Sequence, residues 1–313
     1  MSRPDLSSIL ICLGCGAALP PRAAWDETGT RCTGCGTSVP VVRGIPRFVE
    51  SDAYTTSFSF EWNRHRRTQL DDATSRESEA TFRAKTGLRP QDVAGRLVLD
   101  AGCGMGRFAD VVSRWNASVV GIDLSLAVEA AQTNLGGREN VRLLQADLFR
   151  LPFRPGSFDI VYSLGVLHHT PNCEHALRRL VPLVRPGGRL CVWVYGGLGA
   201  WYRFASLYRR ATVRMPPRLL HALCHVAIPW YYLCRLPLVG ELLFTLLPIS
   251  MHQRAEWRVL DTFDLYSPRY RSAHTYPEVY RWFASEGMVD IALHDFPVAV
   301  AGTRPGPGGE ERA

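Results

Sequence analysis

Long hydrophobic runs are missing from this sequence of 313 residues. Its first residues, MSRPDLSSILICLGCG, contain no sustained apolar core of the kind that opens a secretory signal. No segment reaches the roughly 20 consecutive apolar residues that a membrane-spanning helix needs. Nine cysteines without an export signal favour a reducing compartment, in which thiols stay free or bind metal. We therefore expect a cytoplasmic protein with no transmembrane segment.

A strong charge of one sign is missing as well. The chain has 36 Lys and Arg residues against 29 Asp and Glu residues, which gives a net charge of +7. This surplus permits an acidic partner, such as nucleic acid or an anionic membrane, but does not require one. The length is sufficient for one large α/β domain with a small appendage, or for two modest domains.

Strand-like and helix-like segments alternate between residues 93 and 304. Strands are expected at 96–102, 117–125, 140–148, 157–167 and 187–196, and the intervening segments 106–116 and 126–135 have helical periodicity. A helix at 277–288 and an antiparallel hairpin of 289–296 with 298–304 complete the pattern. This alternation predicts an α/β fold with a doubly wound, mostly parallel sheet that binds its ligand at the carboxyl edge.

The glycine-rich loop after the first of these strands lacks both common phosphate-binding patterns. In VLDAGCGMGRF the glycines are Gly102, Gly104 and Gly106, and Arg107 stands where a dinucleotide fingerprint needs its third glycine. No G-K-[ST] follows, so a triphosphate-binding loop is excluded. Asp100 precedes the loop, and a carboxylate there repels a phosphate but attracts an ammonium or sulfonium group. The loop therefore predicts a cationic ligand with an amino-acid tail, which S-adenosylmethionine (SAM) satisfies.

Two further acidic residues follow strand ends. Asp123 lies 17 residues beyond Gly106, where a carboxylate can accept both ribose hydroxyls, and Asp147 with Leu148 follows the third strand. With FDIVYSLGVLHH and LVRPGGRL, these motifs resemble the class I SAM-dependent methyltransferases from Val98 to about Gly196. The resemblance implies a seven-stranded Rossmann-like sheet.

The same resemblance assigns parts of the cofactor to individual residues. Asp100 and the three loop glycines would line the methionine part, Asp123 the ribose, and Asp147 and Leu148 the adenine. Ser163, at the end of the fourth strand, would face the sulfonium. The predicted cofactor-binding residues are thus Asp100, Gly102, Gly104, Gly106, Asp123, Leu124, Asp147, Leu148 and Ser163.

Four cysteines near the start of the chain are tightly organised. Cys12, Cys15, Cys32 and Cys35 form C-x2-C-x16-C-x2-C, a spacing typical of a tetrahedral zinc site, although two disulfides remain the alternative. Residues 1–50 would form a zinc ribbon, with structural Zn²⁺ replacing the core that so short a segment lacks. The segment resembles the Trm112-like or YbaR-like zinc ribbons, in which contact with RNA is one of several roles.

The remaining segments are less regular. Residues 51–92 are expected to form a helical linker that either closes over the cofactor or packs on the surface. An insertion at about 197–275 is strongly apolar but broken by Pro229, Pro237 and Glu241, and predicts two or three lid helices. The lid would cover a hydrophobic pocket, form a homodimer interface, or make a peripheral membrane contact. Residues 305–313 are expected to be a disordered tail.

Methyl transfer needs a positioned acceptor and often a base that removes one proton. His168 and His169 follow the fourth strand near the expected methyl group and have a suitable pKa, although one of them can instead pack the next helix. His274 and Tyr266 are further candidates, because their segment is expected to fold back over the pocket.

The favoured function is SAM-dependent methylation, at oxygen or nitrogen, of a small, partly hydrophobic metabolite. The Pro-Cys and N-P-P-Y signatures of the common nucleic-acid methyltransferases are absent. Two alternatives stay open: an RNA base methyltransferase that uses the ribbon to contact RNA, as in the rRNA guanine-N1 methyltransferases, and a non-enzymatic interaction protein with a vestigial SAM fold.

Overall fold

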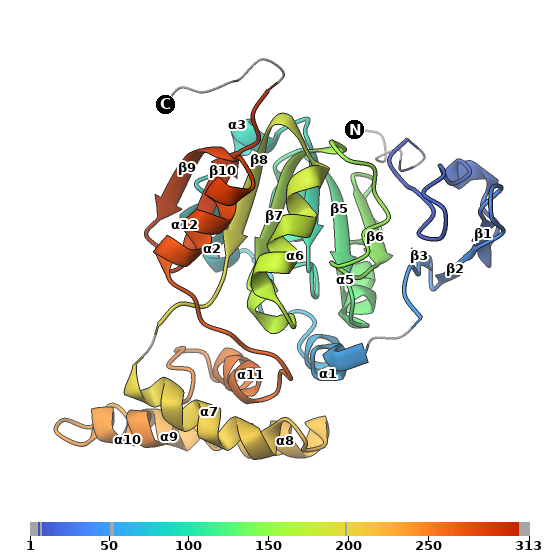
Figure 1. Cartoon of the computed structure of the whole chain (residues 1–313). Coiled ribbons are helices and arrows are strands. Elements are labelled where there is room, and N and C mark those ends of the chain that lie inside the picture. Colours follow the sequence, from blue (N-terminus) through green and yellow to red (C-terminus); the bar gives the residue numbers. More distant parts are fainter. Residues whose placement is uncertain (1–5, 7, 51–52, 198, 307–313) are drawn as a thin grey trace.

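A mixed seven-stranded sheet forms the centre of the computed structural model, which describes residues 6, 8–50, 53–197 and 199–306. The strand order is β6-β5-β4-β7-β8-β10-β9 (Figure 1). Five strands run parallel, whereas β10 pairs antiparallel with both β8 and β9. The strands are β4 (Leu97–Ala101), β5 (Ser118–Asp123), β6 (Val141–Gln145), β7 (Phe158–Leu164), β8 (Val184–Trp193), β9 (Val289–His294) and β10 (Ala299–Thr303). The predicted doubly wound sheet with a closing hairpin is confirmed.

Helices cover both faces of this sheet, and each face has its own apolar core. On one face, α6 and α12 pack against each other, and on the other face α2 packs against α4 (Figure 1). The central strands are almost wholly apolar because both of their faces are buried. The covering helices are α2 (Glu77–Thr86), α3 (Pro90–Val93), α4 (Arg107–Arg114), α5 (Ala127–Leu135), α6 (Cys173–Leu180) and α12 (Tyr276–Ser285). Short 3-10 turns lie at Leu167–His169 (η3) and Val181–Leu183 (η4).

The N-terminal segment folds as a small three-stranded sheet beside the edge strand β6 (Figure 1). It consists of η1 (Arg22–Ala24), β1 (Gly29–Arg31), β2 (Ser38–Val42) and β3 (Ile45–Pro46). The Phe48 amide donates to the Gln145 carbonyl at 2.8 Å, and the Ile11 amide donates to the Pro152 carbonyl at 3.0 Å. Because these bonds satisfy backbone groups beside β6, the segment protects an edge that would otherwise be open to pairing.

Five helices lie beyond the carboxyl edge of the sheet, where two or three were expected (Figure 1). They are α7 (Ala200–Thr212), α8 (Pro217–Cys224), α9 (Ala227–Leu233), α10 (Gly240–Leu246) and α11 (Ala255–Tyr266). Pro229 does not interrupt α9, because it lies in the first turn, where amide groups have no partner within the helix. Leu220 and Cys224 of α8 pack with Phe263 of α11 in a separate small core. Within the described residues, every helix is too short or too polar to cross a membrane.

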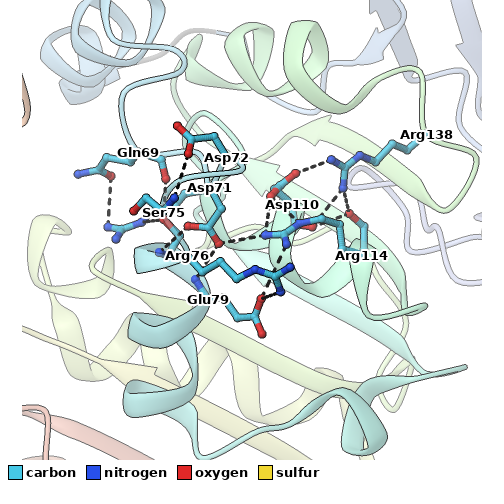
Figure 2. A network of polar contacts seen from close by, with 12 residues as sticks. Gln69, Asp71, Asp72, Ser75, Arg76, Glu79, Asp110, Arg114 and Arg138 are labelled. Atoms are coloured by element: carbon cyan, nitrogen blue, oxygen red, sulfur yellow. Dashed lines mark hydrogen bonds and ion pairs between the residues drawn. The ribbon is translucent and has the colours of Figure 1, made fainter.

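The segment between the ribbon and the sheet is held by polar contacts. It contains η2 (Ala53–Thr55) and α1 (Thr56–Arg64), which packs on α5: the Leu126 amide donates to Ser59 Oγ at 2.9 Å. Figure 2 shows how Arg114 of α4 reaches both Asp71 and Asp110, at 3.0 Å each. The loop before α2 is therefore tied to the sheet domain. Most of the expected tail, residues 307–313, lies outside the described residues.

Candidate active site

A cavity of about 560 Å³ lies at the carboxyl edge of the sheet, between the strand ends and the lid. Of the predicted cofactor residues, those that line it are Gly102, Gly104, Asp123, Leu124, Asp147 and Leu148. Its other walls come from α1, α2, α4, β8 and the lid helices. No described residue of the zinc-ribbon segment lines this cavity.

The glycine loop approaches the cavity with its backbone. Gly102 has a φ of +90°, and a Cβ atom there would lie 2.4 Å from the Val166 side chain, so no other residue fits without movement. The Gly104 amide donates to Asp123 Oδ2 at 2.8 Å, while Asp123 Oδ1 accepts from the Ser125 amide at 2.8 Å. Asp123 therefore joins the first loop to the second and fixes the shape of the cofactor half.

Three predicted cofactor residues are not among the lining residues. Asp100 is buried behind the loop, and this burial raises the pKa of its carboxyl to about 7. Gly106 is the N-cap of α4 and packs against Leu135. The Ser163 hydroxyl donates to the Ala101 carbonyl at 2.8 Å, so it points to the neighbouring strand and not toward a sulfonium. These residues shape the loop from behind.

Of the three candidate histidines, only His169 lines the cavity. Its Nδ1 lies 3.1 Å from the Tyr270 carbonyl oxygen, which can only accept, so Nδ1 donates and Nε2 keeps its lone pair. Burial lowers the pKa of His169 and therefore favours this neutral form. His168 is fully buried, with its ring stacked on Tyr195 at 3.8 Å between centroids.

His274 lies outside the cavity as well, and its Nε2 is 2.8 Å from the Ser272 hydroxyl. It contributes instead to a shallow groove beside α6 and α12. Tyr266, the other candidate, is buried in the lid core and its hydroxyl donates to the Pro248 carbonyl at 2.7 Å. Tertiary packing thus leaves His169 as the one candidate of the four that reaches the cavity.

A carboxylate from the lid lies beside His169. Asp264 Oδ1 is 3.8 Å from His169 Nε2, and Asp264 Oδ2 accepts a hydrogen bond of 2.5 Å from the Tyr195 hydroxyl. The negative charge of Asp264 counters part of the effect of burial on the pKa of His169. A proton taken up by His169 would therefore be stabilised by a neighbouring carboxylate.

Three titratable residues that the sequence did not single out also line the cavity. Glu61 of α1 is fully buried with no hydrogen-bond partner on either oxygen, and burial together with Asp264 and Asp261 raises the pKa of its carboxyl. Burial also raises the pKa of Asp261 to about 7. Lys85 Nζ lies 3.2 Å from the centre of the Trp193 ring, and burial lowers its pKa.

Aromatic rings form most of the remaining wall. Trp62 of α1 lies over the glycine loop, with its indole nitrogen 3.5 Å from the position of a Cβ at Gly104. The other aromatic lining residues are Tyr54, Phe58, Phe108, Trp193, Tyr195, Trp201, Phe244, Trp257 and Phe296. This aromatic wall suits a flat or apolar molecule with a few polar groups. The sequence predicted only that residues 51–92, which contain Trp62, would close over the cofactor or pack on the surface.

The four N-terminal cysteines come together as their spacing predicts. All four Sγ atoms lie within 4.8 Å of one another, and the Cys12–Cys35 and Cys15–Cys32 sulfur pairs are 3.5 and 3.6 Å apart. Tetrahedral zinc, with Zn–S bonds of about 2.3 Å, holds its sulfur atoms about 3.8 Å apart. The Gly14 amide also donates to Cys12 Sγ at 3.3 Å. All nine cysteines are free, so the disulfide alternative does not describe this arrangement.

Comparison with known proteins agrees with this architecture. Residues 99–192 match the family model described as methyltransferase domain. A ubiquinone biosynthesis O-methyltransferase of Albidiferax ferrireducens is 40% identical over 113 residues, which are 33% of this chain and 41% of that protein. The 27-O-demethylrifamycin SV methyltransferase of Amycolatopsis mediterranei is 36% identical, over 39% of this chain and 47% of its own length. The chain spans less than half of these two relatives.

Among solved structures, the magnesium protoporphyrin IX methyltransferase of Synechocystis PCC 6803 is similar at 16% identity and a TM-score of 0.46. The match covers 80% of this chain and 97% of that one. The family match covers most of β4 to β8, and the carboxyl ends of these strands lie at the cavity. Residues 99–192 are therefore similar to a methyltransferase domain.

Proposed function

We propose that this protein transfers a methyl group from SAM to an oxygen or nitrogen atom of a small, partly hydrophobic acceptor. The observation that carries the proposal is a cavity of about 560 Å³, which joins the predicted cofactor residues to an aromatic wall supplied partly by the lid. Its size is typical of small-molecule sites. Two relatives are named for methylation in ubiquinone biosynthesis and of a demethylrifamycin, and both names indicate small acceptors.

In this proposal the strand ends hold the cofactor and the lid holds the acceptor. Asp123 accepts the ribose hydroxyls, Asp147 and Leu148 contact the adenine, and the loop at Gly102 and Gly104 contacts the methionine part. SAM supplies a methyl group on a positively charged sulfur. The chain's own residues orient the acceptor and exclude water, and Trp62 closes the cavity above the loop.

His169 is the proposed base. Its Nδ1–H is held by the Tyr270 carbonyl, so the lone pair on Nε2 is available to take the proton that the acceptor loses. Asp264 then stabilises the protonated ring from 3.8 Å. Because burial lowers the pKa of His169, turnover should rise with pH through a pKa below the ordinary histidine value and stay high at neutral pH.

The test uses the zinc-loaded full chain and SAM labelled at the methyl group, incubated with a cell lysate that is then separated into organic-extractable, RNA and protein fractions. Label in the organic fraction supports the proposal, and label in RNA overturns it. Once the acceptor is isolated, His169→Ala should lower kcat by about 10²- to 10⁴-fold with SAM affinity unchanged. The matched control is His175→Ala, at an exposed histidine of α6. Equal turnover in the two variants would remove His169 as the base.

For the N-terminal segment we propose a Trm112-like or YbaR-like zinc ribbon whose zinc is structural. Cys12, Cys15, Cys32 and Cys35 would hold the ion as thiolates. The backbone pairing beside β6 and the distance of the segment from the cavity lining support a role in stability instead of RNA contact. The free state of all nine cysteines suits a reducing compartment, and we propose the cytoplasm as the location.

A further inference from the structure

The outer side of the lid exposes an unusual amount of apolar surface. Twelve of the nineteen large hydrophobic side chains that are exposed among the described residues lie between residues 207 and 246. Soluble monomers rarely gather so many in one place unless the surface has a partner. The twelve are Leu207, Tyr208, Leu219, Leu223, Val226, Tyr232, Leu233, Leu236, Leu238, Val239, Leu242 and Leu246.

These side chains share one layer of the molecule. Figure 1 shows α7, α8, α9 and α10 beyond α11, on the side away from the sheet. Contacts with α11 bury the inner side of α7, α8 and α9, and α10 packs on α7. We call the opposite, solvent-facing side the outer lid face. On α8, for example, Leu220 and Cys224 face the core, whereas Leu219 and Leu223 are about half exposed.

The same segment has a net positive charge almost as large as that of the whole chain. Residues 199–254 contain seven arginines, no lysine and a single acid, Glu241, so their net charge is +6 against +7 for the whole protein. Five exposed arginines lie between residues 203 and 235 and form no ion pair among those of the described residues. They are Arg203, Arg210, Arg214, Arg218 and Arg235.

Leu238 is the most exposed of the apolar residues. It lies between α9 and α10, and its side chain is fully exposed at 103%. Its φ of +71° belongs to the left-handed region, which a branched side chain such as leucine adopts only at a cost. A strained backbone conformation that exposes a leucine side chain to solvent indicates that this side chain contacts an apolar partner.

We propose that the outer lid face binds the surface of an anionic lipid bilayer. Exposed leucines alternating with arginines on short helices are typical of segments that lie in the membrane interface. Arginines interact with anionic headgroups while the leucines enter the acyl boundary. A second copy of this chain fits the same face poorly, because pairing would bring two surfaces of net charge +6 together.

The position of the face relative to the cavity gives this binding a role in catalysis. On α10, Phe244 lines the cavity, while Leu242 and Leu246 belong to the outer lid face. One helix thus separates the cavity from the docked bilayer. An apolar acceptor dissolved in the bilayer would have only α10 to pass on its way to the cavity. This route rests on the proposed function, whereas the binding of the outer lid face to a bilayer does not.

The test is co-flotation of the zinc-loaded full chain with phosphatidylglycerol–phosphatidylcholine vesicles and with phosphatidylcholine vesicles. Binding should require the anionic lipid and weaken as salt is raised. The double variant Arg214→Gln/Arg218→Gln should bind about 30-fold more weakly, since each arginine near such a surface contributes about fivefold. The matched control Arg83→Gln/Arg281→Gln removes the same charge from exposed sites on α2 and α12 and should leave binding unchanged.

A second pair of variants tests the apolar part of the face. Leu223→Ser/Leu238→Ser should lower vesicle binding by about tenfold or more, whereas Leu293→Ser, at an exposed leucine of β9, should not. Both positions are exposed, so folding should be preserved, which circular dichroism checks. The proposal is overturned if neutral vesicles bind equally well, or if the control variants lose as much binding as the lid variants. The proposal is also overturned if sedimentation shows a dimer that the lid variants abolish. A third outcome that overturns it is that RNA, at the same concentration of negative charge, displaces the protein from the vesicles while the leucine variants bind RNA as the wild type does.

Discussion

Replacing Glu61 by glutamine should stabilise the folded protein, and increasingly so as the pH rises. Glu61 is fully buried, neither of its oxygens has a hydrogen-bond partner, and the groups that act on its pKa are Asp264 and Asp261. Since no cation compensates it, the pKa is raised and the folded state retains a proton that the unfolded chain releases above about pH 4.3. Glu61 therefore does not lower the free energy of unfolding at a pH below its pKa in the unfolded chain. The free energy of unfolding falls as the pH rises from that value toward the pKa of Glu61 in the folded protein.

The magnitude follows from proton linkage. Each pH unit over which Glu61 is protonated only in the folded state costs about 1.4 kcal/mol. Between pH 5 and pH 6 the free energy of unfolding of the wild type should therefore fall by about 1.4 kcal/mol relative to Glu61→Gln. Between pH 5 and pH 6 Glu61 is neutral in the folded protein, as glutamine is. Asp100 and Asp261, whose pKa values burial raises to about 7, therefore ionise alike in both folded proteins and cancel in the difference.

The assay is urea unfolding of both proteins at pH 5, 6 and 7, followed by fluorescence and circular dichroism. Glu139→Gln, at an exposed glutamate before β6, is the matched control and should differ from the wild type by a small, pH-independent amount. Parallel pH profiles for the wild type and Glu61→Gln would refute the reasoning, because they would mean that Glu61 ionises in the folded protein as it does in the unfolded chain.

Two further predictions concern the elements around the site. Removing zinc with a chelator should release one equivalent of metal and lower the melting temperature by about 2–4 °C for each kcal/mol lost; no metal release would exclude the zinc site. Arg114→Ala should cost about 1–3 kcal/mol in urea unfolding, because it leaves the buried carboxylates of Asp71 and Asp110 with fewer partners (Figure 2). Arg76→Ala removes a mostly exposed partner and should cost less than about 1 kcal/mol; equal losses would contradict the network.

Local signals in the sequence were sufficient to predict the sheet and the glycine loop that lines the cavity. Alternating apolar strands and periodic helices predicted β4 to β10 close to their observed bounds, because backbone hydrogen bonding and burial on both faces restrict which residues such strands accept. The cysteine spacing predicted a site whose four sulfur atoms do converge. Both patterns are determined over short stretches of chain, so a single sequence contains them.

The lid and the part of the cavity that it lines depend on contacts that local patterns do not encode. The sequence predicted that Pro229 interrupts a helix. In the structure α9 begins at Ala227, so Pro229 lies in its first turn and does not interrupt it. His168 and His169 are neighbours with the same local signal, yet packing against Tyr195 buries one ring and leaves the other on the cavity.

The sequence by itself determined the order of the strands along the chain, the glycine loop, the acidic residues at strand ends and the spacing of the four clustered thiols. Only the tertiary structure decided which side chains meet in the cavity. Glu61, Lys85 and Asp264 come from α1, α2 and α11, which are far apart in sequence and are joined only when the lid packs over the sheet. Non-local packing gives these side chains their burial and their altered pKa values, and no spacing along the chain records it.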